Sequence, residues 1–133
     1  MPDPYTAIQI VMMPRDTNPH GTIFGGVILS YIDMAGATAA RREVALRGGS
    51  ADTKIVTVAV NRVEFKQPVM VGDVVRFETS VERFGRTCIT MRINVVAERA
   101  GTEIHVTESE VVYVGIGEDR QPVPLLPARP AAG

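Results

Sequence analysis

The sequence is poor in cysteine and in aromatic residues: among 133 residues there is one cysteine, Cys88, and no tryptophan. A single cysteine cannot form an intrachain disulfide and has no partner thiol for a zinc site, so a disulfide framework is excluded and no metal centre is expected. Cys88 lies in a strand-like segment and is interpreted as a small core residue rather than a nucleophile. This use of cysteine is typical of the reducing cytoplasm, which we expect to be the compartment.

An excess of charge of one sign is also absent, because 14 basic and 15 acidic residues give a net charge of -1. The basic residues are scattered along the chain, so we expect neither a nucleic-acid partner nor a basic membrane-binding surface. No apolar run reaches the roughly 18–20 residues of a membrane span. The opening stretch "MPDPYTAIQIVMMP" also lacks the pattern of a secretory leader. We therefore expect a soluble, unprocessed protein.

What the sequence does contain is enough apolar residues, 45% of the chain, to build one substantial core. A short strand is predicted from Ile8 to Met13, and the residue types of turns fill the loop from Pro14 to Gly21. A helix is predicted from Gly25 to about Leu46, because this stretch has no proline and ends before Gly48-Gly49. The first two thirds of the helix is apolar almost all round, which predicts burial on every side.

The rest of the chain changes to the alternating pattern of strands, rich in valine, isoleucine and threonine. Short glycine-containing links, FGRT and RAGT, join the second of these segments to the third and the third to the fourth, and they predict antiparallel hairpins. Residues 117–133 carry four prolines, which cannot enter a sheet interior. They are predicted to form an extended or disordered tail after a domain of residues 1–116. The four predicted strands cover residues 53–65, 73–84, 87–98 and 102–116.

An α+β fold follows, in which a long central helix is wrapped by a curved antiparallel sheet of about five strands. Such a sheet has two open edges. Pairing two sheets edge to edge would remove one open edge from each, which favours a homodimer. We therefore predict one compact domain that assembles with a second copy of itself.

Several motifs, in chain order, resemble the hotdog-fold acyl-CoA thioesterases, in particular the cytosolic acyl-CoA hydrolase group. The resemblance rests on "MPRDTNPHGTIFGG" followed by "ILSYID", and on "RVEFKQPVMVGDVV", "RTCITMRINV" and "EDRQPVP" further along the chain. It implies the hotdog fold, hydrolysis of an acyl-CoA thioester, active sites at a dimer interface, and assembly of the dimers into a trimer of dimers. No cofactor is expected, because coenzyme A is itself part of the substrate and the product.

Hydrolysis of a thioester needs a group that activates water and donors that hold the carbonyl oxygen. Asp33 is the single carboxylate in the apolar part of the predicted helix and is the candidate general base, or the nucleophile itself. Its helical neighbours three and four positions away include no cation, so only a partner from elsewhere could make it a structural ion pair. Gly25 and Gly26 begin the helix, where free backbone N–H groups can hold an oxyanion, or where glycine simply permits a tight entry into the helix.

Gly25 and Asp33 are eight residues apart, which is about 12 Å along one helix, so they cannot contact the same carbonyl group. If both serve one thioester, they come from two subunits, and the homodimer is the minimal active unit. By the resemblance, Asn18 joins Gly25 on one side of the site and orients the carbonyl or the water through its side-chain amide. The alternative is that Asn18 is only a turn residue that bonds its own backbone.

The coenzyme A arm needs cations or backbone donors for its phosphates. Gly85, Arg86 and Thr87 combine a flexible turn, a guanidinium group and a hydroxyl group, and the resemblance places this region along the pantetheine and the nucleotide. Arg62 and Lys66 are further candidate cations. The alternative for residues 85–87 is an exposed hairpin tip that binds no ligand.

Two other functions stay open. Hotdog acyl dehydratases and hydratases use a histidine before the helix and an acid on it. His20 and Asp33 are placed somewhat like that pair, although the sequence around His20 lacks the dehydratase pattern. A non-catalytic acyl-CoA sensor would keep the fold and the groove, but we expect it to need an output module for which 133 residues leave no room.

Overall fold

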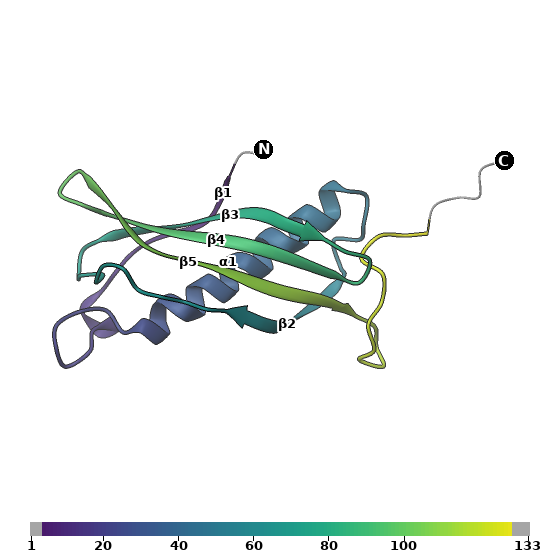
Figure 1. Ribbon diagram of the computed structural model, residues 1–133, viewed down its shortest axis with the longest axis horizontal. Helices are drawn as coiled ribbons and strands as arrows, with labels where there is room; N and C mark the ends of the chain where they lie inside the picture. The colour runs from purple at the N-terminus through teal and green to yellow at the C-terminus, as the bar shows by residue number, and fades with distance from the viewer. Residues whose placement is uncertain (1–3, 129–133) are drawn as a thin grey trace.

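A computed structural model of the protein describes residues 4–128, which form one long helix and one five-stranded sheet (Figure 1). The helix α1 spans Gly25–Leu46, as predicted, and a short 3-10 turn at Pro14–Asp16 precedes it. No helix among the described residues is long and apolar enough to cross a membrane. The strands are β1 (Tyr5–Val11), β2 (Lys54–Asn61), β3 (Val74–Phe84), β4 (Cys88–Arg99) and β5 (Thr102–Ile116).

The sheet is antiparallel throughout, and its strand order is β1-β3-β4-β5-β2. The two predicted hairpins join β3 to β4 and β4 to β5, while β1 and β2 form the edges. The prediction that β2 continues to Phe65 is wrong, because the strand ends at Asn61. Beyond Asn61 the chain leaves the sheet, and the Phe65 ring lies against the start of the helix at Gly25.

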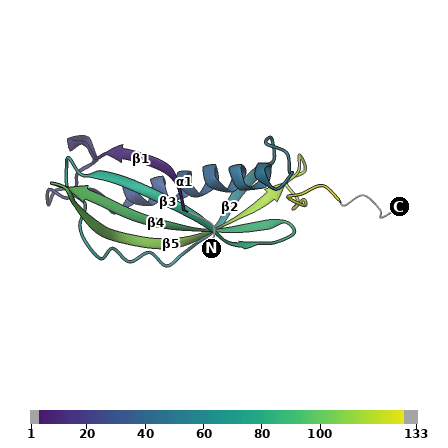
Figure 2. The same cartoon turned by 90° about the horizontal axis from the view of Figure 1, so that it is seen from above.

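The core lies between α1 and one face of the sheet (Figure 2). Alternate residues of β3, β4 and β5 point toward the helix, as the twofold repeat of strands requires. Small side chains on the helix let it approach the sheet closely. The buried helix residues are Ile28, Ile32, Ala35, Gly36, Ala39, Ala40 and Val44.

The other side of α1 is not covered within one chain. Leu29 is 39% exposed and Met34 is 49% exposed. The prediction that the helix is buried on every side is therefore wrong for the single chain, because the sheet curves around one side only. Exposed apolar side chains in a continuous patch are typical of a surface that another molecule covers.

The chain after β5 packs on the fold as far as it is described. The N–H groups of Val123 and Leu125 donate to the carbonyl oxygens of Gly115 and Arg86, both at 2.9 Å. The Leu125 side chain is 2% exposed and belongs to the core. Residues 129–133 of the predicted tail lie outside the described residues, and the domain boundary at residue 116 stays a prediction.

Candidate active site

The Asp33 carboxylate is half-buried and is held through one of its two oxygens. Oδ1 accepts a hydrogen bond from the Thr57 hydroxyl at 2.7 Å. The Tyr113 hydroxyl lies 3.3 Å from the same oxygen and 2.8 Å from the Asp33 backbone carbonyl oxygen. Among residues 4–128, Oδ2 has no hydrogen-bond partner and Asp33 has no ion-pair partner. One carboxylate oxygen is thus fixed, and the other is available to accept a proton.

The sheet register brings the two hydroxyl groups together. Thr57 of β2 and Tyr113 of β5 are directly opposite each other in the antiparallel pairing. The register shifts immediately after Thr57, so that Val58 is an extra residue in the edge strand. Bulges of this kind bend a strand and re-aim its side chains. The Asp33 contacts therefore depend on two neighbouring strands at one level of the sheet.

Tyr113 is fully buried, and its hydroxyl reaches the helix beside Gly36. A Cβ atom at position 36 would lie 2.2 Å from the Tyr113 hydroxyl oxygen, so a larger residue there would displace the tyrosine. Burial, followed by the charge of the nearby Asp33 carboxylate, raises the pKa of Tyr113 far above its ordinary value. The phenol therefore stays protonated and remains a hydrogen-bond donor at physiological pH.

Sequence analysis alone does not identify Thr57, Tyr113 or Gly36 as parts of this site. Two signals were available: a glycine inside a helix usually has a packing reason, and a buried tyrosine needs a partner for its hydroxyl. The sequence does not say which residues these signals connect. Thr57 and Tyr113 are 24 and 80 residues from Asp33, so their contacts follow from strand register and helix placement.

The start of α1 carries the predicted oxyanion donors. The Phe24 carbonyl accepts the N–H group of Val27 at 3.1 Å, while the N–H groups of Gly25 and Gly26 have no acceptor within the described chain. The helix dipole favours negative charge at this end. Gly25 lies against the Phe65 ring, whereas no atom lies within 4 Å of a Cβ built at Gly26. Gly26 is therefore the more open of the two positions.

Asn18 organises the loop before the helix. Its Oδ1 accepts the N–H groups of His20 and Thr22 at 2.9 Å and 3.1 Å, and its Nδ2 donates to the Thr22 hydroxyl at 2.7 Å. These bonds are those of a turn residue, but the second hydrogen of Nδ2 has no acceptor among the described residues. The exposed His20 side chain forms no hydrogen bond with Asp33 in the described chain.

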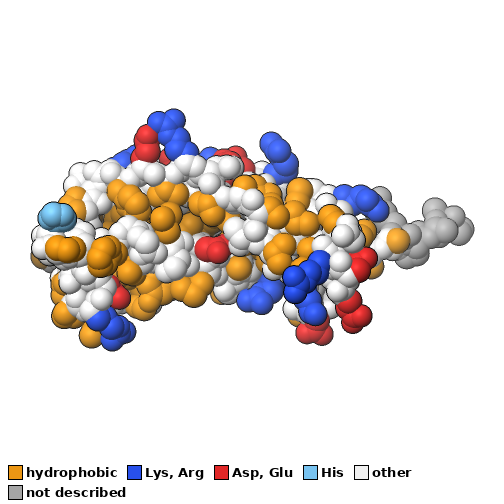
Figure 3. Space-filling model, turned by 90° about the horizontal axis from the view of Figure 1, so that it is seen from below, with side chains coloured by type: hydrophobic (Ala, Val, Ile, Leu, Met, Phe, Trp, Pro, Cys, Tyr) orange, Lys and Arg blue, Asp and Glu red, His pale blue; other side chains and the backbone are white. Residues whose placement is uncertain are grey.

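Within one chain the helix N-terminus and the candidate base do not meet, because about 12 Å of helix separates Gly25 from Asp33. Apolar side chains are spread over the face formed by α1 and the edge strand β2, and most charged side chains in this view lie at its rim or at one end (Figure 3). An apolar surface along an unpaired sheet edge is typical of a subunit interface. Its exposed apolar side chains are Leu29 and Met34 of α1 and Val56, Val58 and Val60 of β2.

Residues Gly85, Arg86 and Thr87 form the tip of the β3–β4 hairpin. Leu125 and Gly115 donate their N–H groups to the Arg86 and Thr87 carbonyl oxygens, both at 2.9 Å. The Arg86 side chain is exposed and has no ion-pair partner among residues 4–128. A guanidinium group beside apolar walls suits a phosphate attached to a ring system. It borders a cavity of about 380 Å³ whose other walls include Phe84, Pro124, Leu126 and Pro127.

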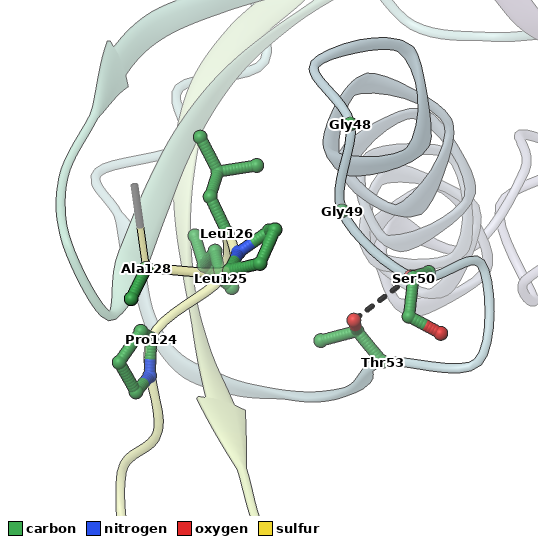
Figure 4. Close-up of a pocket in the computed structure, with 9 residues that line it drawn as sticks. Gly48, Gly49, Ser50, Thr53, Pro124, Leu125, Leu126 and Ala128 are labelled. Carbon is green, nitrogen blue, oxygen red and sulfur yellow. Dashed lines mark hydrogen bonds between the residues drawn. The ribbon is translucent and has the colours of Figure 1, made fainter. Parts of the chain in front are cut away.

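A neighbouring cavity of about 620 Å³ lies between the end of α1 and the last described residues (Figure 4). The Thr53 hydroxyl donates to the Ser50 carbonyl at 2.8 Å, and the Ser50 hydroxyl accepts the Asp52 N–H group at 3.1 Å. Both lining hydroxyl groups thus take part in hydrogen bonds of their own turn. Asp33 lies about 20 Å away along the helix, so this cavity is separate from the candidate base.

Arg62 and Lys66 follow β2 and line a third cavity together with Glu64 and Glu108. Arg62 forms an ion pair with Glu64. The two carboxylates offset the two cations, which weakens the attraction for a phosphate. Arg62 and Lys66 lie roughly 20 Å along the sheet from the 85–87 hairpin. Within one chain they therefore do not form a single site with Arg86.

Known proteins resemble this chain in both sequence and fold. A sequence model of the thioesterase superfamily matches residues 20–104. An uncharacterized acyl-CoA thioester hydrolase of Buchnera aphidicola is 41% identical over 90% of this chain and 87% of its own length. The hexameric thioesterase y2039 of Yersinia pestis is 32% identical, with a TM-score of 0.83, over 97% of this chain and all of that one.

A second solved structure, Cj0915 of Campylobacter jejuni, is a hexameric hotdog-fold thioesterase. It is 39% identical to this chain, with a TM-score of 0.79, and the match covers 90% of this chain and 88% of that one. The predicted fold is confirmed, because one helix packed on a five-stranded antiparallel sheet is the arrangement that these structures share. The chain belongs to the thioesterase superfamily and has the hotdog fold of its solved members.

Proposed function

We propose that the protein hydrolyses acyl-CoA thioesters to a free acid and coenzyme A, with Asp33 as the general base. The observation that carries this proposal is the hydrogen bonding of the Asp33 carboxylate. Oδ1 is held by hydroxyl donors, Oδ2 is unbonded among the described residues, and no cation neutralises the group there. The name of the Buchnera relative, an acyl-CoA thioester hydrolase, supports the choice of substrate.

In the proposed reaction, water gives a proton to Asp33 while its oxygen bonds to the thioester carbonyl carbon. The carbon–sulfur bond of the resulting tetrahedral intermediate then breaks, and the coenzyme A thiolate takes the proton back from Asp33. In the nucleophilic alternative, Oδ2 attacks the carbonyl carbon, displaces coenzyme A and forms an anhydride that water then opens. A single turnover in heavy-oxygen water separates the two, because only the anhydride route can label Asp33 itself.

The oxyanion of the intermediate is proposed to bind the helix N-terminus of a second chain. Gly25 and Gly26 supply the N–H groups, and the remaining Nδ2 hydrogen of Asn18 orients the carbonyl or the water. The distance along one helix supports two subunits, as does the apolar face of α1 and β2. A homodimer would then be the minimal active unit. The hexameric state of the two solved relatives supports a trimer of dimers.

Coenzyme A is proposed to lie along the hairpin of Gly85, Arg86 and Thr87. The exposed Arg86 guanidinium and the apolar cavity beside it support this position for the nucleotide end. Arg62 and Lys66 are weaker candidates, because Glu64 and another carboxylate lie beside them. The reaction needs no further cofactor. We place the protein in the cytoplasm, which fits its single unpaired cysteine.

Release of free thiol from a panel of short, medium, long and aromatic acyl-CoAs tests the proposal. Asp33→Asn keeps the shape and the Oδ1 contacts of the side chain but removes the base, so thiol release should fall by roughly a hundredfold or more. Asp52→Asn, an exposed loop position, is the matched control and should leave the rate unchanged. Full activity in folded Asp33→Asn would contradict the proposed role.

The same panel separates the other candidate functions. A dehydratase or hydratase would give an enoyl product without free thiol and would depend on His20. A sensor would bind acyl-CoA without turnover. The dehydratase is the weaker candidate, because the sequence around His20 lacks the dehydratase pattern.

A further inference from the structure

Gly36 occupies an interior position of α1, where glycine is less favourable than every ordinary residue except proline. The space beside it is filled by the Tyr113 hydroxyl, since a Cβ atom there would lie 2.2 Å from the hydroxyl oxygen and 3.0 Å from the ring carbon that carries it. The helix therefore accepts an unfavourable residue at the point where this phenol reaches it.

The phenol has a single O–H proton and two acceptors, both on Asp33. One is the backbone carbonyl oxygen at 2.8 Å, and the other is Oδ1 at 3.3 Å. From β2, Thr57 donates to the same Oδ1 at 2.7 Å. Among the described residues, no lysine, arginine or histidine from α1, β2 or β5 forms a hydrogen bond or ion pair with Asp33.

We infer that Tyr113 is a positioning residue for Asp33, and that Gly36 is the residue that admits its hydroxyl. The phenol ties the sheet to the helix backbone at the carboxylate and lies beside Oδ1, so that the unbonded Oδ2 faces the substrate. The inference deepens the proposed function and rests on it for the effect on turnover. The contact between the Tyr113 hydroxyl and Asp33 does not depend on the proposed function, because it follows from the hydrogen-bond distances alone.

The raised pKa of Tyr113 supports this role, because the phenol keeps its proton across the working range of the enzyme. A donor that keeps its proton holds the same contact with Asp33 at every pH at which the enzyme works. Loss of the hydroxyl should therefore lower kcat while KM stays the same, a split that a general loss of stability would not cause.

The test begins with Tyr113→Phe, which keeps the buried ring and removes only the hydroxyl. We expect kcat to fall about tenfold with little change in KM, because the hydrogen bond that ties the sheet to the helix at Asp33 is lost and substrate binding is not. Tyr5→Phe removes a tyrosine hydroxyl at the start of β1 and is the matched control. In parallel, carbon NMR of labelled carboxyl groups at one fixed pH, assigned with Asp33→Asn, follows the environment of the Asp33 carboxylate directly.

Gly36→Ala gives a second route to the same change, because the added methyl group pushes the hydroxyl away while Asp33, Thr57 and Tyr113 all remain. It should lower kcat with little change in KM and move the Asp33 carboxyl signal, as Tyr113→Phe does. In the double variant the hydroxyl that causes the closest contact is gone, so adding Gly36→Ala to Tyr113→Phe should cost little more. Effects that simply add would contradict the fit between Gly36 and the hydroxyl.

The outcomes separate the two proposals. If Tyr113→Phe leaves the Asp33 carboxyl signal in place and turns over substrate as the unmodified protein does, the positioning role is wrong while the proposed function stands. If the unmodified protein releases no thiol but the Asp33 carboxyl signal still moves in Tyr113→Phe, the positioning role stands and the proposed function is wrong.

Discussion

The Tyr113 hydroxyl lies 2.8 Å from the backbone carbonyl oxygen of Asp33, although 80 residues separate the two in the sequence. The contact joins the core of the sheet to the helix at the residue that carries the candidate base. Tyr113 is itself fully buried, so its position is set by the packing around it. The geometry of Asp33 is therefore coupled to the core of the protein.

The proposed oxyanion donor can be removed by a proline substitution in the first turn of α1, where proline is tolerated. Gly26→Pro deletes one N–H group, and no atom outside the adjoining backbone lies within 4 Å of a Cβ at this position. We expect kcat for thiol release to fall by roughly 10²–10³-fold, the usual effect of losing one oxyanion donor. Gly26→Ala keeps the N–H group and is the control. Equal rates for the two folded variants would exclude this donor.

The edge of β2 is predicted to be a subunit interface. Val58 is 56% exposed on this edge, and Val58→Lys places a charge where a second chain would pair. The variant should dissociate to smaller species in sedimentation velocity and lose thiol release in parallel. Leu46→Lys, at the end of α1 and 65% exposed in one chain, serves as the comparison. An unchanged sedimentation coefficient in Val58→Lys would place the interface elsewhere.

Stability should depend on pH through Asp73, which is 2% exposed and accepts hydrogen bonds from Arg99 at 2.7 Å and 2.9 Å and from the Met70 N–H group at 2.9 Å. Burial raises the pKa of this carboxyl, but the Arg99 and Met70 hydrogen bonds outweigh burial and hold it below the ordinary value of 3.8.

Because the native pKa is the lower one, the unfolded chain binds the proton more readily, and the stability from this pair is present above about pH 4 and is lost as the pH falls below it. Asp73→Asn should be less stable at pH 7 by about 1–3 kcal/mol and should show a weaker loss of stability in acid, measured by urea unfolding at several pH values. Parallel stability curves for Asp73→Asn and the unmodified protein would contradict this.

The segment after β5 is predicted to be part of the folding unit. Leu125 is 2% exposed and packs against Gly115, so Leu125→Ala should lower the free energy of unfolding by about 2–4 kcal/mol. Leu126, which is half-buried, provides the matched substitution, and Leu126→Ala should cost clearly less. Thermal and urea unfolding measure both. Similar small losses for the two variants would show that the segment contributes little.

Much of the fold can be predicted because glycine residues mark the ends of the helix and of most strands. The glycine pairs at Gly25-Gly26 and Gly48-Gly49 bracket α1, and the two glycine-containing hairpins set the ends of β3, β4 and β5 to within a residue or two. The first strand begins earlier than its predicted start at Ile8, because Tyr5 already pairs with β3. The alternating pattern after Asn61 continues without a strand, because pairing to β5 ends there.

Some residues of the candidate site can likewise be predicted from the sequence, and others cannot. Asp33 stands out in the sequence as a lone carboxylate on an apolar helix, and the glycines at the helix start stand out by position. Thr57 and Tyr113 do not, because their roles depend on the register of β2 with β5 and on a bulge after Thr57. For Asn18 the sequence allows both a turn role and a role in the site, and the hydrogen bonds described in the structure are those of a turn residue.

The proposal that one active site takes Asp33 from one subunit and its oxyanion donors from another can be tested by mixing two inactive variants. Asp33→Asn and Gly26→Pro are co-expressed with different tags, and thiol release is measured on the purified mixture. If the site is shared, each mixed dimer contains one intact site, and random pairing gives about a quarter of the unmodified activity. If the mixture is no more active than the separate variants, the two groups do not work together across a subunit interface.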